Sequence, residues 1–132
     1  MRCAATTVLL IAIAAGAPIL KATAAPADTP AAQVERLLAD RPGIARALVD
    51  RLHVRAWIDR RFAQTHPPLI WDPASPVSGR GGEFDAGDPK LTRLRISPDA
   101  SGIDQLATLI FELHNVMGYD TFAEIHDRAV AG

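Results

Sequence analysis

Three side chains near the end of the sequence, those of Glu112, His114 and Asn115, could take part in chemistry because they lie on one predicted helix. A carboxylate can act as a general base, and a nearby imidazole or amide can hold the group on which it acts. In an enzyme we expect Glu112 to be the base, supported by His114 or His126. No nucleophile elbow and no recognisable Ser/His/Asp grouping accompanies these residues.

The helix that carries them has clear start and stop signals. Ser101 and Asp104 form a capping box, which predicts a helix start, and Gly118 predicts its end directly after Met117. Apolar residues recur at helical spacing along one face, which we expect to be the buried side. This apolar stripe consists of Ile103, Leu106, Ile110, Leu113 and Met117.

Glu112 shares the opposite, polar face of this helix with Thr108 and Asn115. A polar face of an amphipathic helix normally points to water, so we expect Glu112 to be a surface carboxylate. The same face would line a cleft only if the predicted strand Leu91–Ser97 passed over it. On this interpretation Glu112→Gln changes stability by no more than about 0.5 kcal/mol, whereas Ile110→Ala costs about 2–5 kcal/mol.

A second capping box follows at Thr121 and Glu124. It predicts a separate last helix, which would bury Phe122, Ile125 and Ala129. The chain ends soon afterwards, at Gly132, and we leave open whether the domain is truncated at this end.

The strand and helix between Leu91 and Asn115 resemble the active-site region of zincin metallopeptidases. In that family the helix carries His-Glu-x-x-His, whose histidines hold zinc while the glutamate activates the metal-bound water. Phe111 stands where the first histidine would be, Glu112 at the glutamate, and Asn115 at the second histidine. The resemblance therefore implies a degenerate, non-catalytic relative; an accidental match of a glutamate on an amphipathic helix is the alternative.

We expect neither a metal nor a cofactor. His114 lies about 160° around the helix from Glu112 and cannot replace a missing ligand. The downstream acidic ligand of the zincin family could only be Glu124 or Asp127. Elsewhere, His53 and His66 have no partner at ligand spacing and are expected at the surface. The group Glu83, Asp85 and Asp88 lacks the spacing of a helix-loop-helix calcium site.

The middle of the chain predicts a small sheet. Leu69–Trp71 is a short strand after the prolines that end the helical region. The segment Asp72–Pro89 is rich in glycine and proline, which predicts turns around at most one short strand near Glu83–Phe84; Gly79–Gly82 is expected to be a turn. Leu91–Ser97 alternates as a half-buried strand and should pair with Leu69–Trp71 or with Glu83–Phe84. Leu91, Arg93 and Arg95 should point to one side of this strand, and Thr92, Leu94 and Ile96 to the other.

Helices precede this sheet. Thr29 can cap a first helix that has Pro30 at its first position and a short apolar stripe. A further helical stretch runs from Pro42 to Gln64, with a shift of its apolar face that indicates a bend near His53. Trp57 is expected to pack onto the rest of the domain.

The N-terminal residues have the pattern of a secretory signal peptide, with an apolar run from Val8 to Ala15 and small residues at the end. We expect cleavage between Ala24 and Ala25, a mature domain over residues 25–132 and a secreted or periplasmic location. The apolar run is too short for a membrane span. Cys3 is the one cysteine and leaves with the signal peptide, which excludes thiol chemistry in the mature protein.

The charge of the mature chain also narrows its function. Without Arg2 and Lys21, 12 basic and 15 acidic residues remain, a formal charge of −3. Because acidic residues are interleaved with the arginines between residues 36 and 61, we expect no nucleic-acid partner.

These patterns predict one small α+β domain, with N-terminal helices, a small irregular and mostly antiparallel sheet, and two C-terminal helices. The favoured function is an exported, non-catalytic binding or accessory module that presents Asp72–Pro89 to a protein or cell-envelope partner. The alternative is a metal-independent hydrolase with Glu112 as general base. The binding module requires no catalytic grouping, and none is recognisable in the sequence, so we favour it over an enzyme.

Overall fold

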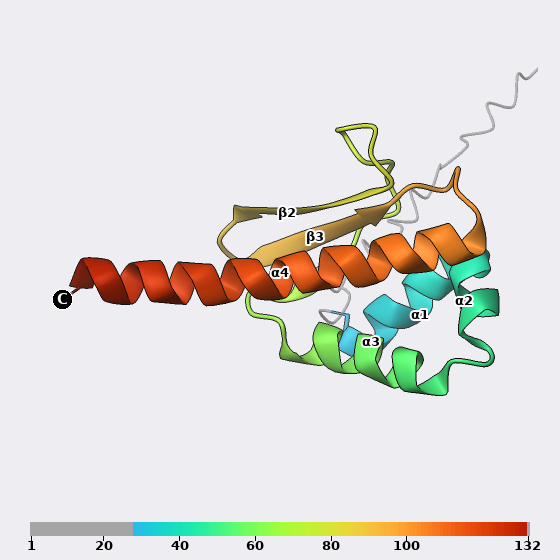
Figure 1. Cartoon of the computed structure of the whole chain (residues 1–132), viewed down its shortest axis with the longest axis horizontal. Coiled ribbons are helices and arrows are strands. Elements are labelled where there is room, and N and C mark those ends of the chain that lie inside the picture. Colours follow the sequence, from blue (N-terminus) through green and yellow to red (C-terminus); the bar gives the residue numbers. More distant parts are fainter. Residues whose placement is uncertain (1–27, 132) are drawn as a thin grey trace, which may run out of the picture.

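The computed structural model describes residues 28–131, so the predicted signal peptide and its cleavage site at Ala24 lie outside the described residues. Within this range the chain forms an α+β fold, as predicted, in which helices pack around a three-stranded sheet (Figure 1). The elements are α1 (Pro30–Asp40), α2 (Pro42–Leu48), α3 (Leu52–Gln64), β1 (Leu69–Trp71), β2 (Gly82–Asp88), β3 (Leu91–Ile96) and α4 (Gly102–Ala131).

The start of α1 is formed as its sequence predicts. The Thr29 hydroxyl accepts a hydrogen bond from the Ala32 N–H at 3.2 Å, and Pro30 occupies the first turn, where its missing N–H is not needed. The apolar stripe Val34, Leu37 and Leu38 is buried in the core.

The stretch Pro42–Gln64 forms two helices, and the predicted bend near His53 is in fact a break over Val49–Arg51. The Val49 N–H donates to the Arg46 carbonyl and the Arg51 N–H to the Leu48 carbonyl, which closes tight turns between α2 and α3. The apolar face shifts at this break because α3 starts in a new direction.

The sheet has the order β1-β3-β2, so β3 is its central strand. β3 runs parallel to β1 and antiparallel to β2, so the sheet is mixed, and both predicted pairings of this strand are formed. The predicted alternation is present, and the face that carries Thr92, Leu94 and Ile96 is the buried one. β2 is longer than the short strand predicted near Glu83–Phe84, because its pairing with β3 extends to Asp88.

The start of α4 packs very closely against α2. A Cβ atom on Gly102 would lie 2.5 Å from the Gly43 carbonyl oxygen, so only glycine allows this contact. Ser101 and Asp104 cap the helix, with the Asp104 N–H donating to the Ser101 hydroxyl and that hydroxyl donating to the Asp104 carboxylate. The contact at Gly102 fixes which face of α4 turns to the core.

The buried face of α4 is rotated from the predicted one. Ile103 is 53% exposed and Ile110 is only half-buried, whereas Leu109 and Val116 are buried in the core. The sheet packs against the face of α4 next to the helix's apolar stripe. Polar residues of α4 are therefore buried together with apolar ones. The buried residues of α4 are Gln105, Leu106, Leu109, Glu112, Leu113 and Val116.

The predicted stop at Gly118 and the separate last helix are wrong, because α4 continues to Ala131 (Figure 1). The Thr121 hydroxyl donates to the Met117 carbonyl within the helix instead of capping a new one. Phe122 and Ile125, expected in the core, are 70% and 60% exposed, because the last turns of α4 extend past the rest of the molecule. No helix of the described residues is long and apolar enough to cross a membrane.

A buried arginine, Arg41, joins helices and sheet. Its side chain is 6% exposed and lies over the Trp71 ring, and its N–H groups donate to the carbonyl oxygens of Ile96, Asp40 and Pro73 at 2.9–3.0 Å. These bonds to carbonyl oxygens replace the water that a buried guanidinium would otherwise need.

Candidate functional site

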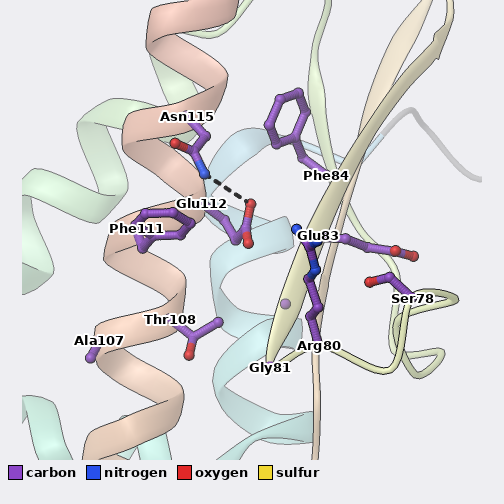
Figure 2. A pocket seen from close by; sticks show the side chains of 11 residues that line it. Ser78, Arg80, Gly81, Glu83, Phe84, Ala107, Thr108, Phe111, Glu112 and Asn115 are labelled. Atoms are coloured by element: carbon purple, nitrogen blue, oxygen red, sulfur yellow. Dashed lines mark hydrogen bonds between the residues drawn. The ribbon is translucent and has the colours of Figure 1, made fainter.

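A groove of about 690 Å³ lies between α4 and the segment that leads into β2. Figure 2 shows Glu112 projecting from α4 into this groove, with Asn115 beside it and Arg80 on the facing wall. The strand side contributes Ser78, Arg80, Gly81, Gly82, Glu83 and Phe84, and α4 contributes Ala107, Thr108, Phe111, Glu112 and Asn115.

Glycines bring the two walls together. A Cβ atom on Gly82 would lie 2.6 Å from Thr108 Cγ2 and 3.1 Å from the Arg95 carbonyl oxygen, so the backbone touches α4 here. Gly79 has a φ of 67°, which a turn requires and glycine adopts readily. The predicted turn at Gly79–Gly82 is therefore present at Gly79, and Gly82 already belongs to β2. The polar face of α4, expected to be open to water unless Leu91–Ser97 passed over it, is covered by β2.

Glu112 is a buried carboxylate, and the expectation that it faces water is wrong. The residue is only 7% exposed, and it accepts one long hydrogen bond, from Asn115 Nδ2 at 3.5 Å. Among residues 28–131 it forms no ion pair. Burial raises the pKa of Glu112, and the nearby Glu83 carboxylate adds to this, while the Asn115 hydrogen bond and the charge of Arg80 offset it only in part.

Glu83 lies on the opposite wall, and its carboxylate binds groups other than Glu112. Figure 2 shows its side chain turned away from Glu112. Its Oε1 atom accepts hydrogen bonds from the Val77 N–H and from Arg95 Nη1, both at 2.9 Å. The Val77 N–H and Arg95 lower the pKa of Glu83, so it remains ionised beside the groove.

Arg95 is shared by two carboxylates. Besides Glu83 it binds Asp72, whose Oδ2 atom lies 2.7 Å from Arg95 Nε. Burial alone would raise the pKa of Asp72, but the Ala74 N–H and Arg95 outweigh it and lower that pKa. Arg95 is therefore committed to this cluster and is not available to Glu112.

Arg80 is the one basic side chain of the described part of the chain that lines the groove. It is exposed, and it forms no ion pair with the described side chains. The groove thus presents a buried carboxylate on one wall and an exposed guanidinium on the other, with the aromatic rings of Phe84 and Phe111 beside them.

The structure brings together two of the three predicted site residues. Glu112 and Asn115 share the groove, whereas His114 points to another side of α4 and packs on Trp57, with ring centroids 5.0 Å apart. His126 is 66% exposed, in the last turns of α4. Neither histidine is therefore in place to assist Glu112.

A metal site has no support from the geometry. The residues described contain no group of three or more His, Cys, Asp or Glu side chains that could hold a metal ion. Glu124 and Asp127, the candidates for a downstream ligand, are 71% and 87% exposed, in the last turns of α4. His53 and His66 are exposed, as predicted.

The sequence interpretation missed Arg80 and the Arg95 cluster. The alternation places Arg95 on one face of its strand, but its cross-strand neighbour Glu83 could be recognised only once the register was known. Comparison with protein-family models, with curated proteins and with solved structures gives no match to this chain. The zincin resemblance therefore rests on the residues quoted for it alone.

Proposed function

We propose that the protein is an exported, non-catalytic binding module whose ligand occupies the groove beside Glu112. The buried carboxylate carries this proposal: it has one long hydrogen bond and no cation within the described structure. A buried charge without a partner is unfavourable, and a bound cation would remove that cost.

The surroundings of Glu112 define the chemistry of such a ligand. An ammonium or guanidinium group can reach the carboxylate from the open side of the groove, and an adjoining apolar group can pack on Phe111, which is 62% exposed. A basic side chain of a protein or cell-envelope partner has this combination. One wall of the groove belongs to Asp72–Pro89, the segment expected to carry the interaction.

The zincin resemblance is part of this proposal. Glu112 occupies the place of the family's glutamate, and Phe111 and Asn115 replace the zinc ligands. In such a relative the groove would keep its ability to bind a chain segment and would have lost its metal chemistry.

A second candidate, a metal-independent hydrolase, is favoured by the raised pKa of Glu112. A carboxylate whose pKa is raised is a stronger base and can accept a proton from an attacking water molecule. An enzyme of this type would lose turnover entirely in Glu112→Gln, and its rate would rise with pH through the pKa of Glu112. Binding without any turnover supports the module instead.

The binding proposal is tested with benzylamine, which joins an ammonium group to an aromatic ring. Titration followed by ¹H–¹⁵N NMR should move the Asn115 side-chain amide in a saturable way, and benzyl alcohol should bind at least about tenfold more weakly. Glu112→Gln should abolish the response. Glu124→Gln is the matched control, because it removes an exposed carboxylate from the same helix.

Two outcomes would overturn the proposal. One is equal binding of benzylamine and benzyl alcohol, which would mean that the charge is not recognised. The other is unchanged benzylamine binding by the Glu112→Gln protein.

A further inference from the structure

A second hollow lies on another side of α4, against α3, and shares no residue with the Glu112 groove. Its volume is about 360 Å³, enough for one small ring compound. It is lined by His53, Val54, Trp57, Arg60, Ile110 and His114. The sequence shows no partner at ligand spacing for His53 and suggests His114 only as a support for Glu112, yet the packing of α3 against α4 places both around one hollow.

The Trp57 indole forms a fixed wall of this hollow. The His114 ring packs on it with an interplanar angle of 36°, and the Arg61 guanidinium lies 5.7 Å from the indole ring centroid. Trp57 is partly buried, so part of the indole remains open to a ligand. Flat rings are held well on such a surface, because stacking adds to the burial of apolar area.

The polar groups of the hollow are all basic. His53, Arg60 and His114 line it, and no carboxylate of residues 28–131 does. Arg55, on the same helix, is bound to Glu35 and Asp59, whereas Arg60 forms no ion pair with any described side chain. The guanidinium of Arg60 therefore remains free to bind an anion from solution.

We propose that this hollow binds a small planar anion, an aromatic carboxylate, with its ring against Trp57 and its carboxylate at Arg60. A guanidinium can hold both oxygens of a carboxylate, and the two imidazole rings offer further N–H donors at the rim. The opposite charge preference of the Glu112 groove makes the two sites distinguishable: this one takes the anion and the groove takes the cation.

Benzoate tests the proposal in the full-length protein, with benzyl alcohol and benzylamine as neutral and cationic counterparts. The chain has two tryptophans, so ¹H–¹⁵N spectra contain two indole signals. Trp71 is buried and its Nε1 donates to Asp40 at 2.7 Å, which makes its signal an internal reference. Benzoate should shift the Trp57 signal in a saturable way and leave that of Trp71 in place.

Arg60→Gln should weaken benzoate binding about tenfold, while Lys90→Gln, which removes an exposed positive charge elsewhere, should leave it unchanged. An unshifted Trp71 signal in each variant shows that the fold is intact. The proposal fails if benzyl alcohol binds as well as benzoate, if Arg60→Gln has no effect, or if Trp57 shows no saturable shift up to about 50 mM benzoate.

Discussion

Glu83 and Glu112 line one groove from opposite walls, and their surroundings differ in every respect that matters to a carboxylate. On the strand side, Glu83 shares Arg95 with Asp72 and accepts a backbone N–H, and its pKa is lowered. On the helix side, Glu112 is more deeply buried, has one long hydrogen bond, and its pKa is raised.

The difference separates a structural role of Glu83 from the binding role that we propose for Glu112. The strand-side carboxylates already have their cation, so they hold β2, β3 and the loop after β1 together. Glu112 has no such cation among the described residues, and in the function that we propose the ligand supplies it. Two kinds of substitution test this difference: removal of the cation that binds Glu83, and addition of a cation beside Glu112.

The largest effect is expected from Arg95→Leu. This change leaves Asp72 and Glu83 without their shared cation, and we expect a loss of about 2–3 kcal/mol in the free energy of unfolding. Urea denaturation at pH 7 would measure it. Arg93→Leu on the same strand face is the control and should cost no more than about 0.5 kcal/mol, since Arg93 has no ion pair among the described residues. An equal loss of unfolding free energy in the two variants would show that the ion pairs of Arg95 with Asp72 and Glu83 contribute little.

Gly82→Ala should come next, because it forces the two walls apart. The added Cβ would meet Thr108 and the Arg95 carbonyl, and such overpacking costs about 1–3 kcal/mol. The double change Gly82→Ala with Thr108→Ala should recover part of the loss, since it removes Thr108 Cγ2. Thermal unfolding of the single and double variants would show the recovery, and its absence would mean that the walls are not in critical contact.

Glu112→Gln should stabilise the protein by about 1 kcal/mol near pH 7, in contrast to the small effect expected of a surface residue. The folded protein holds the Glu112 proton more tightly than the unfolded chain, so stability falls as pH rises from the usual glutamate pKa through the raised value. The gain should therefore vanish below about pH 4, where the carboxyl is protonated in both states. Denaturation curves between pH 3 and 8 would measure the difference between the two proteins.

The strand-side carboxylates should respond to pH in the opposite sense. Because the pKa values of Asp72 and Glu83 are lowered, their contribution is present above the usual values and is lost as pH falls through the lowered ones. The stability of Glu112→Gln should not fall as the pH rises above the usual glutamate pKa. A fall as large as that of the wild type would contradict the raised pKa of Glu112.

The smallest effects concern Asn115. Asn115→Ala removes the one hydrogen bond of Glu112 and should raise its pKa further, whereas Asn115→Lys supplies a cation and should lower it. Stability should change by only about 0.5 kcal/mol. A ¹³C NMR titration of the Glu112 carboxyl would follow both shifts; shifts of the same sign in both variants would contradict the prediction.

Local patterns in the sequence correctly predicted the helix starts and the strand whose formation depends on residues close together in the chain. Thr29 with Pro30, Ser101 with Asp104, and the alternation of Leu91–Ile96 depend on neighbours along the chain, and each forms as expected. The predicted helix end at Gly118 is wrong because a glycine inside a helix costs only about 1 kcal/mol and does not by itself end the helix.

The burial of the candidate site could not be predicted from local sequence patterns, because it depends on contacts between elements that are distant in the chain. Which face of α4 is buried depends on the contact between Gly43 and Gly102 and on the passage of β2 beside Thr108. A helical projection of α4 alone assigns Glu112 to water, because it contains nothing about the strand that covers that face. The sequence could name Glu112 and Asn115, but not their burial.

Arg41 has a consequence for how the molecule assembles. Its three hydrogen-bond acceptors belong to the end of α1, the end of β3 and the loop after β1. Until all three stretches have met, the guanidinium must stay in water, because a partly formed site would bury a charge without its acceptors. Arg41 thus makes these stretches fold and unfold as one cooperative unit, and an intermediate that lacks any one of them gains little from forming the other two.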